Sequence, residues 1–543
     1  MKLTYDGLKN RQDWGQAEIE LPVYDPIQLA RRTKEAPVWV HFGIGNIFRI
    51  FIGGIADRLV SGGMLDKGIT CAETFDFDIV DKIYRPYDNL VLAVTLHEDG
   101  HKDKRVLGSL TEALKAKPGD AADWERLQRI FSDSSLQMVS FTITEKGYAL
   151  RNAGGDYLGY VQADMDNGPD SVTGAMGILT ALLYTRFKAG KYPLALVSMD
   201  NVSQNGKKLR ESVLETAHVW AEEGLVEQAF TAYVEDESTV SFPWTMIDKI
   251  TPRPSEEVSR TLTWDGVADM RIVVTSKQTY IAPFVNAEGP EYLVIEDSFP
   301  NGRPALEKAG VYMTDRETVN KAERMKVTAC LNPIHTALCT YARMLGYNLF
   351  AEGMKDPELR ELARQIGYTE GLPVVKDPGI LSPKTFLDEL MQVRFPNPYL
   401  GDTSARIAVD ISQMVGIRFG ETIKAYVSRC GSAERLTAIP LAIAGWLRYL
   451  LAVDDKGETF ELSSDPMFPE LLTQLAGVEF GRPESLTEQL RPILSNAHIF
   501  GSNLYAVGLG EKIEDMVRQE LAGVGAVRRT LIRYLCSDRA IPE

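Results

Sequence analysis

Apolar runs of strand length alternate with helical patterns through the first three hundred residues. Residues 38–42, "VWVHF", are predicted to form a short buried strand that is followed by a glycine turn and a helix from Asn46 to Val60. Alternation of this kind favours a parallel sheet with helices on both faces. Further strand-like runs lie at residues 69–76, 90–97, 136–144 and 193–201, and two later, antiparallel strands are expected between residues 279 and 299.

The hydrophobic pattern changes after about residue 300, where helical periodicity dominates. The turn-rich stretch "FPNGRP", residues 299–304, marks the joint. We therefore expect an α/β domain at residues 1–300 and a mostly α-helical domain at residues 301–543. Helices are predicted at residues 319–347, 356–366, 382–393, 404–415, 420–453 and 511–535.

Composition narrows the possible partners. A length of 543 residues suits two domains, and a net charge of −16 argues against nucleic acid as the main partner. No apolar run approaches the length of a membrane span, and the N-terminus lacks the apolar stretch of a signal peptide. The five cysteines form no CxxC pair, which indicates neither a zinc knuckle nor a disulfide framework. A reducing cytoplasm fits best.

The turn after the first strand resembles half of a dinucleotide-binding fingerprint. Gly43 lets the chain turn, and Gly45 lets the backbone approach a pyrophosphate at the start of a helix that Asn46 opens. The third glycine is absent, because Phe48 occupies its place. Arg49, one turn into the helix, is a candidate phosphate ligand. The alternative is a plain strand-to-helix turn with a surface arginine.

A carboxylate that binds the adenosine ribose is expected at the end of the second strand. Glu73, Asp76 and Asp78 compete for this role. An acid at this place would repel a 2′-phosphate and favour NAD over NADP. The alternative is that these acids cap the following helix.

Polar residues also follow the later strands of this domain. Asp200 and Asn201 end one strand, Glu145 ends another, and Asp248 follows an apolar run. Ligands of open α/β sheets bind at the carboxyl ends of the strands. Each residue taken alone is more often a cap or a turn residue.

The segment "KVTACLNPIHTAL" places three polar side chains in an otherwise apolar stretch. Lysine is rarely buried unless it is paired or functional, and a buried amine suits general base chemistry. Oxidation of an alcohol by hydride transfer needs such a base for the hydroxyl proton, together with donors for the developing alkoxide. Lys326, Asn332 and His335 are therefore candidates. The alternative is a helix start at Asn332-Pro333 with His335 as a core histidine.

At this point the chain resembles the polyol-specific long-chain dehydrogenases, which include mannitol dehydrogenases and fructuronate reductases. The resemblance runs over residues 37–536. It rests on "HFGIGNIFR", "TITEKGY", "SMDNVSQNG", "IDKITPRP", "VIEDSFPNGRPALEKAGV", "ERMKVTACLNPIHTAL" and "RFPNPYLGDTSARIA", in this order.

The resemblance implies a zinc-free mechanism with NAD as cofactor. By similarity, Lys326 takes the proton from the substrate hydroxyl or returns it in the reduction direction. The other roles that the resemblance implies belong to Asn201 and Asn332 as oxyanion donors, His335 as the group that orients substrate, Glu323 as the gate for proton exit, and Asp248, Arg394 and Asn397 as substrate contacts. The glycine turn and the polar strand ends described above predict the cofactor site at Gly43, Gly45, Asn46, Arg49, Glu73, Asp76, Glu145 and Asp200.

The sequence departs from the family pattern in three places. Five residues, instead of the commoner four, separate Lys326 from Asn332. Since Pro333 removes an amide donor, we predict a π-bulge or a kink between Val327 and Pro333. Phe48-Arg49 replaces a common histidine-arginine pair, and insertions lengthen the chain around residues 154–170 and 453–469.

The "LNPIHTAL" version is more similar to family members of hexuronate metabolism, which favours interconversion of fructuronate and mannonate. The carboxylate of a uronate needs a cation, and Arg394 or Arg406 is a candidate. The alternatives are a mannitol 2-dehydrogenase type of polyol dehydrogenase, an epimerase that retains its NAD, and a non-catalytic NAD sensor. Family members are often monomers, and the sequence itself does not indicate an oligomeric state.

Overall fold

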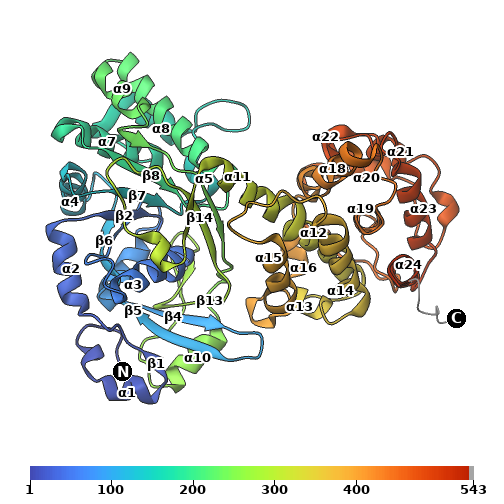
Figure 1. Ribbon diagram of the computed structural model, residues 1–543, viewed down its shortest axis with the longest axis horizontal. Coiled ribbons are helices and arrows are strands. Elements are labelled where there is room, and N and C mark those ends of the chain that lie inside the picture. Colours follow the sequence, from blue (N-terminus) through green and yellow to red (C-terminus); the bar gives the residue numbers. More distant parts are fainter. Residues whose placement is uncertain (537–543) are drawn as a thin grey trace. The chain divides into compact units, whose positions relative to one another are not determined.

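The computed structural model describes residues 1–536 and divides into two compact units (Figure 1). The first unit comprises Met1–Asn320, and the second begins at Lys321, inside helix α11 (Arg316–Met325). Each unit is described separately.

The first unit is built around a six-stranded parallel sheet. The strand order is β6-β3-β2-β7-β8-β9, and every neighbouring pair is parallel. With the strands counted along the chain, this is the order 3-2-1-4-5-6 of dinucleotide-binding sheets. The strands are β2 (Trp39–Phe42), β3 (Ile69–Glu73), β6 (Leu110–Lys115), β7 (Met138–Phe141), β8 (Leu194–Ser198) and β9 (Val240–Ser241).

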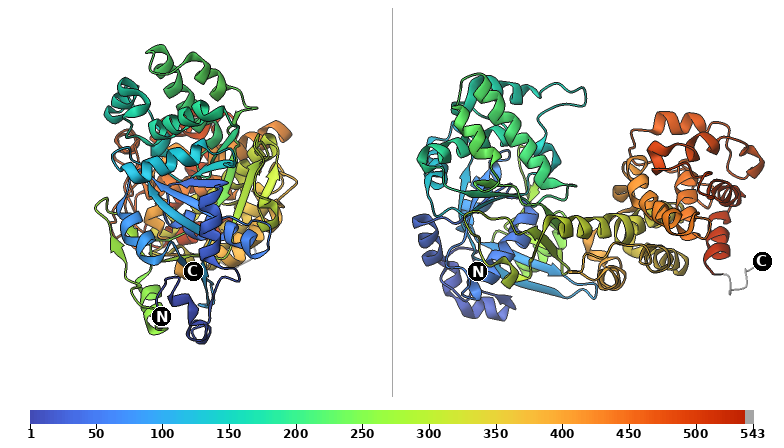
Figure 2. Two further views of the ribbon diagram at one scale, coloured as in Figure 1. Left: turned by 90° about the vertical axis from the view of Figure 1, so that its left-hand side faces the viewer. Right: turned by 45° about the horizontal axis from the view of Figure 1, so that its top comes forward.

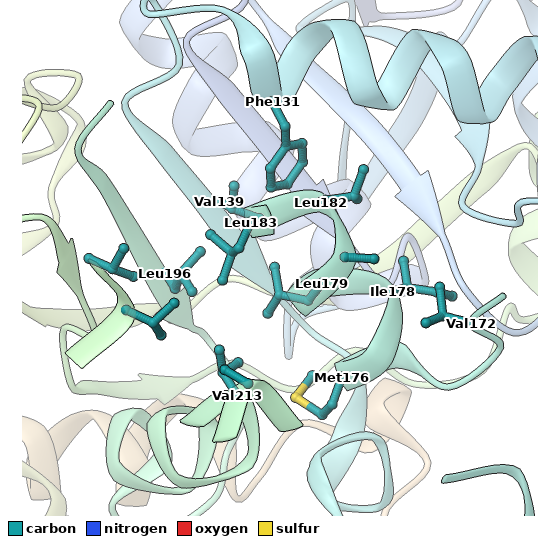
Figure 3. Packing of buried hydrophobic residues seen from close by; sticks show 14 of the residues in the cluster. Phe131, Val139, Val172, Met176, Ile178, Leu179, Leu182, Leu183, Leu196 and Val213 are labelled. Carbon is teal, nitrogen blue, oxygen red and sulfur yellow. The ribbon is translucent and has the colours of Figure 1, made fainter. Parts of the chain in front are cut away.

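Alternate residues of these strands enter two separate apolar cores, because successive side chains of a strand point to opposite faces. Val40, Val139 and Leu196 enter the core under α4 (Ala121–Ser132), α7 (Ala175–Gly190) and α8 (Asn205–Glu222). Figure 3 shows Val139 and Leu196 in this core, together with Phe131, Leu179 and Val213. Trp39, Met138 and Ala195 enter the core beneath the π-helix η2 (Phe48–Ile52) and α3 (Gly53–Ser61). Both faces of the sheet are therefore covered, as the apolar strand pattern predicted.

Smaller sheets flank the parallel sheet. The predicted strand near residue 90 is β4 (Val91–Leu96), and it belongs to a four-stranded sheet with β1 (Ile19–Glu20), β5 (Lys102–Leu107) and β13 (Phe284–Glu288). The third strand of the parallel sheet is instead β6. A three-stranded sheet contains β10 (Thr245–Asp248), β14 (Tyr292–Glu296) and β15 (Tyr312–Thr314), and β11 (Val273–Val274) and β12 (Tyr280–Ile281) form a separate two-stranded sheet.

Within residues 321–536 the second unit consists of helices joined by loops, with no β-strand, as Figure 2 also shows. The helix predicted for residues 420–453 is interrupted, because Gly431 adopts a left-handed conformation with φ 76° and ends the first segment. The main helices are η7 (Lys326–Cys330), α12 (Asn332–Met344), α14 (Pro357–Arg364), η8 (Gln365–Gly371), α15 (Pro383–Glu389), η9 (Leu390–Arg394), η11 (Gly416–Gly420), α18 (Glu421–Cys430), α19 (Ala438–Tyr449), α23 (Gly510–Glu520) and α24 (Ala526–Leu535). The predicted fold class, a Rossmann-like domain followed by a helical domain, is confirmed.

Each of the two segments predicted to be insertions, 154–170 and 453–469, carries a buried aspartate that binds backbone amides at or just before the start of a helix. Asp164 accepts hydrogen bonds of 2.8 Å and 2.7 Å from the amides of Thr173 and Gly174, just before α7. Asp455 accepts from the amides of Val527 and Arg528 in the first turn of α24. Helix starts leave such amides without partners inside the helix, so both carboxylates act as caps.

Candidate active site

The two glycines after β2 have different surroundings. Gly43 has φ +87°, and a Cβ there would lie 2.2 Å from the carbonyl oxygen of Thr142, so only glycine fits. A Cβ at Gly45 would meet no atom within 4 Å. Open space above a turn that enters a helix is what a dinucleotide phosphate requires. Asn46 adds a buried Oδ1 without a hydrogen-bond partner among the described residues, so this turn fits the cofactor that the fold implies.

Arg49 is fully buried, and its contacts are to the protein itself. Its guanidinium donates hydrogen bonds of 2.7 Å and 3.0 Å to the carbonyl oxygens of Ala282 and Pro283, next to β13. Burial lowers the pKa of Arg49 to about 10. These bonds connect η2 to the residues that precede β13 in the four-stranded sheet. They do not support the predicted contact between Arg49 and a phosphate.

The acids after β3 are engaged in local structure. Glu73 is 5% exposed, and its carboxylate accepts hydrogen bonds from the amides of Thr74, Phe75 and Asp76 and from the amide of Ile44 in the glycine turn. Burial raises the pKa of Glu73. The carboxylate therefore fixes the glycine turn to the end of β3. This role as a cap was the alternative that the sequence left open.

The carboxyl ends of β7 and β8 are joined by Asp200. Its carboxylate accepts from the amides of Ile143 and Thr144 at 2.9 Å and 3.0 Å and from the hydroxyl of Tyr148 at 2.6 Å. Burial raises the pKa of Asp200. Thr142 in turn donates from Oγ1 to the carbonyl oxygen of Gly43, so the ends of β2, β7 and β8 form one connected edge.

Two further predicted residues lie at this edge with exposed side chains. Glu145 is paired with Lys208, and Asn201 follows Asp200 at the end of β8. Asn205 was missed by the sequence reasoning. It is buried, and its amide bonds the carbonyl of Asp200 and Oγ1 of Thr245, which connects β8 to β10. The signal that could have indicated it is the run of polar residues that ends in "SQNG".

Asp248 is the last residue of β10, in the sheet beside the parallel one. It is 7% exposed and lies opposite Tyr292 of β14 in the antiparallel ladder. This places a buried carboxylate at a strand end, where the sequence predicted a substrate contact.

The segment with Lys326 contains the predicted irregularity. Lys326–Cys330 form a π-helix, in which the amide of Leu331 donates to the carbonyl of Lys326, five residues earlier, at 3.0 Å. Pro333 has no amide hydrogen for the carbonyl of Ala329, and Gly371 approaches that carbonyl so closely that a Cβ would lie 2.7 Å from it. The wider turn absorbs the extra residue between Lys326 and Asn332, and the predicted π-bulge is confirmed.

Lys326 is 2% exposed at the start of this turn. Glu323, three residues earlier on α11, and Asn332, at the start of α12, are both half-buried. The helical unit therefore holds the amine in a protected place, close in the chain to an acid and an amide.

His335, on α12, contacts the "RFPNP" segment through the ring of Phe395. Its ring centroid lies 4.8 Å from that of Phe350 and 5.1 Å from that of Phe395. Phe395 follows Arg394, which is 2% exposed at the end of the π-helix η9. Asn397 is also buried, and its Oδ1 accepts from the amide of Tyr399. Within this unit, the structure gathers three predicted residues, His335, Arg394 and Asn397, around two aromatic rings.

Residues 1–536 contain neither a cluster of metal-binding side chains nor a helix that could span a membrane. No group of three or more histidine, cysteine or acidic side chains there is arranged to hold a metal ion. No helix in the same range has both the length and the apolar character needed to cross a membrane.

Comparison with family models covers both units. Residues 38–308 match the mannitol dehydrogenase Rossmann domain, and residues 318–517 match the mannitol dehydrogenase C-terminal domain.

The similar proteins and structures include enzymes that act on sugar acids and polyols. A D-mannonate oxidoreductase of Thermotoga maritima is 51% identical over 98% of both chains, and a polyol:NADP oxidoreductase of Gluconobacter oxydans is 28% identical over 85% of this chain and 88% of its own. Among solved structures, a substrate-free D-sorbitol dehydrogenase has a TM-score of 0.77 at 26% identity, covering 94% and 97% of the two chains. The mannitol 2-dehydrogenase of Pseudomonas fluorescens, in a ternary complex with NAD and D-mannitol, has a TM-score of 0.70 at 25% identity, covering 99% and 100%. This chain belongs to the mannitol dehydrogenase family of oxidoreductases.

Proposed function

We propose that the protein interconverts D-fructuronate and D-mannonate by hydride transfer with a nicotinamide dinucleotide, NAD(H) in the first instance. The observation that carries the chemistry is the buried Lys326 in a π-turn, followed by Asn332 and His335 on α12. The substrate is supported by the whole-length similarity to the Thermotoga maritima D-mannonate oxidoreductase. The cofactor is supported by the NAD complex of the similar mannitol 2-dehydrogenase.

The dinucleotide would be held at the edge formed by Gly43, Gly45 and Asn46. Its nicotinamide ring supplies the acceptor or donor of the hydride when it is bound. The chain's own contribution is a turn without side chains above Gly45 and a buried Oδ1 at Asn46. Asp200 keeps the neighbouring loop in position by binding the amides of Ile143 and Thr144.

Lys326 is assigned the proton transfer. In the oxidation direction its amine takes the proton of the substrate hydroxyl, and in the reduction direction it returns that proton. With an exposure of only 2%, the amine is shielded from bulk water. Asn332 and Asn201 are assigned to the developing alkoxide as amide donors, His335 to substrate orientation and Glu323 to proton exit.

A uronate differs from a polyol by its carboxylate, for which we propose Arg394. Arg406, the other candidate, is paired with Asp402 four residues earlier. Arg394 is buried beside Phe395, and Asn397 lies in the same segment. A planar guanidinium can bind a carboxylate through two parallel hydrogen bonds. Asp248 is assigned to the substrate hydroxyls.

A substrate panel tests this function. Mannonate, altronate, mannitol, arabinitol and their keto forms are offered with NAD(H) and NADP(H), and nicotinamide absorbance is followed. We expect mannonate and fructuronate to have the highest kcat/KM. Faster turnover of mannitol would instead indicate a polyol dehydrogenase, the second candidate, which the similarity to the mannitol 2-dehydrogenase structure favours. Conversion of a sugar acid without net change in nicotinamide absorbance would indicate an epimerase.

A further inference from the structure

The loop after β3 offers little negative charge to an adenosine ribose. This loop lies beside the ribose of the dinucleotide when the cofactor binds at the site proposed above. Glu73 is surrounded by four backbone amides. Asp76 is 3% exposed; its Oδ2 accepts from the hydroxyl of Thr275 at 2.6 Å, and its Oδ1 is buried. Asp78 accepts from the amide of Ser276 and from Lys82, which lowers its pKa to about 2, and the charge of this ionised carboxylate is balanced by Lys82.

The groups that do reach the surface at this place are aromatic and cationic. Phe75, two residues beyond β3, is 64% exposed. The hairpin β11–β12 docks on the loop through the bonds that Thr275 and Ser276 make to Asp76 and Asp78. This docking places Nζ of Lys277 4.9 Å from the centroid of the Phe75 ring.

A second lysine lies beyond the neighbouring strand. Lys117 follows β6, whose end is joined to β3 by the bond from the amide of Ala116 to the carbonyl of Glu73. Its Nζ lies 5.7 Å from the ring of Phe77. Within residues 1–536, neither Lys117 nor Lys277 forms an ion pair, whereas Lys82 is paired with Asp78 and Lys115 with Asp81. Two exposed positive charges at this edge are thus not neutralised by a carboxylate of the described chain.

We propose that the chain binds NADP(H) as well as NAD(H), with Lys277 as the residue that receives the 2′-phosphate. Discrimination against NADP in this fold depends on an acid that binds the ribose hydroxyls, and a nearby cation accommodates the 2′-phosphate. Here the acids are buried or engaged, and the cations are exposed. The Phe75 ring offers an apolar face for the adenine, and Lys117 adds a second positive charge.

Binding of two nucleotides that differ only by the 2′-phosphate isolates this contact. The full-length chain is titrated calorimetrically with adenosine 2′,5′-bisphosphate and with 5′-AMP, and NADPH and NADH are compared by their nicotinamide fluorescence. We expect the bisphosphate to bind more tightly than 5′-AMP, with an advantage that shrinks as salt is added. Lys277→Glu should raise the ratio of the NADPH to the NADH dissociation constant by about tenfold or more, since a charge-assisted hydrogen bond is lost.

Lys188→Glu is the matched control. Lys188 is also an exposed lysine over an aromatic ring, that of Tyr184, but it lies on α7 and not in the loops after β3 and β6 or in the β11–β12 hairpin. It should leave the ratio unchanged. The inference is overturned if NADH binds and the bisphosphate has no advantage over 5′-AMP, or if Lys277→Glu leaves the ratio as it was. Failure of both NADH and NADPH to bind would overturn the proposed function itself.

Discussion

The hydroxyl of Tyr341 lies 2.6 Å from Oε1 of Glu520 and 2.7 Å from the carbonyl oxygen of Leu441, inside the helical unit. A hydroxyl carries one proton, so it cannot donate to both oxygens. Both contacts are satisfied when Glu520 is protonated and donates to Tyr341, which then donates to Leu441. Burial raises the pKa of Glu520 to about 8, in agreement with this arrangement.

Stability should therefore fall as the pH rises. The unfolded chain releases the Glu520 proton near pH 4.5, whereas the folded chain keeps it up to about pH 8. Between these values the folded state binds more protons, so the free energy of unfolding decreases with rising pH, by roughly several kcal/mol. Glu520→Gln, which keeps the donor without the titration, should remove this part of the pH dependence in urea unfolding curves. Parallel pH profiles of the two proteins would contradict the assignment.

Lys326→Ala should lower kcat by about 10² to 10⁴, because a positioned general acid–base contributes a factor of this size. Dinucleotide binding, measured by nicotinamide fluorescence, should persist. Lys326→Arg keeps the positive charge, but a guanidinium does not release its proton near neutral pH. Its kcat should therefore be as low as that of Lys326→Ala. A Lys326→Ala enzyme within tenfold of the unchanged protein would refute the role.

The two glycines of the turn should respond differently to alanine. Gly43→Ala places a Cβ against the carbonyl of Thr142 and strains a positive φ, so the thermal midpoint should drop together with cofactor binding. Gly45→Ala meets open space, so the fold should keep its midpoint while the dinucleotide dissociation constant rises by about tenfold or more. Unchanged dinucleotide affinity in Gly45→Ala would show that this space is not the phosphate site.

The π-turn can be tested through the glycine that packs on it. In Gly371→Ala the new Cβ would lie 2.7 Å from the carbonyl oxygen of Ala329, which should destabilise the protein by about 1–3 kcal/mol and lower kcat by moving Lys326. Gly353→Ala, where the nearest atom would be 3.4 Å away, is the control and should have little effect on either quantity. Urea unfolding and steady-state kinetics report the two effects. Full activity and stability in Gly371→Ala would mean that the turn does not depend on this contact.

Features of the fold that depend on residues close together in the chain were predicted from the sequence. The glycine turn after β2 and the alternation of strands and helices predicted the Rossmann-like unit. The count of residues between Lys326 and Asn332, one more than in the family pattern, together with Pro333, predicted a π-bulge or a kink here, and a π-helix is found.

The sequence did not reveal the role of a side chain whose hydrogen-bond partner is distant in the chain. The carboxylate of Glu73 binds the amide of Ile44, 29 residues away in the chain, and that of Asp200 binds the amide of Ile143, 57 residues away. From the sequence alone, an acid at a strand end that faces a ligand cannot be told from one that binds the protein itself. Strand β6, "LTEALK", has a mixed pattern and was missed, and β4 was expected in the wrong sheet. Gly431 ends a helix that periodicity alone continues.

The two inserted segments set a limit on how this chain can be shortened. Each appears as surplus length, yet each supplies one carboxylate to backbone amides at a helix start: Asp164 binds the two amides that precede α7, and Asp455 binds two amides in the first turn of α24. Trimming either segment would leave bare N–H groups at the beginning of a long helix. Engineering of compact variants should therefore retain both aspartates or supply a replacement cap at the helix itself.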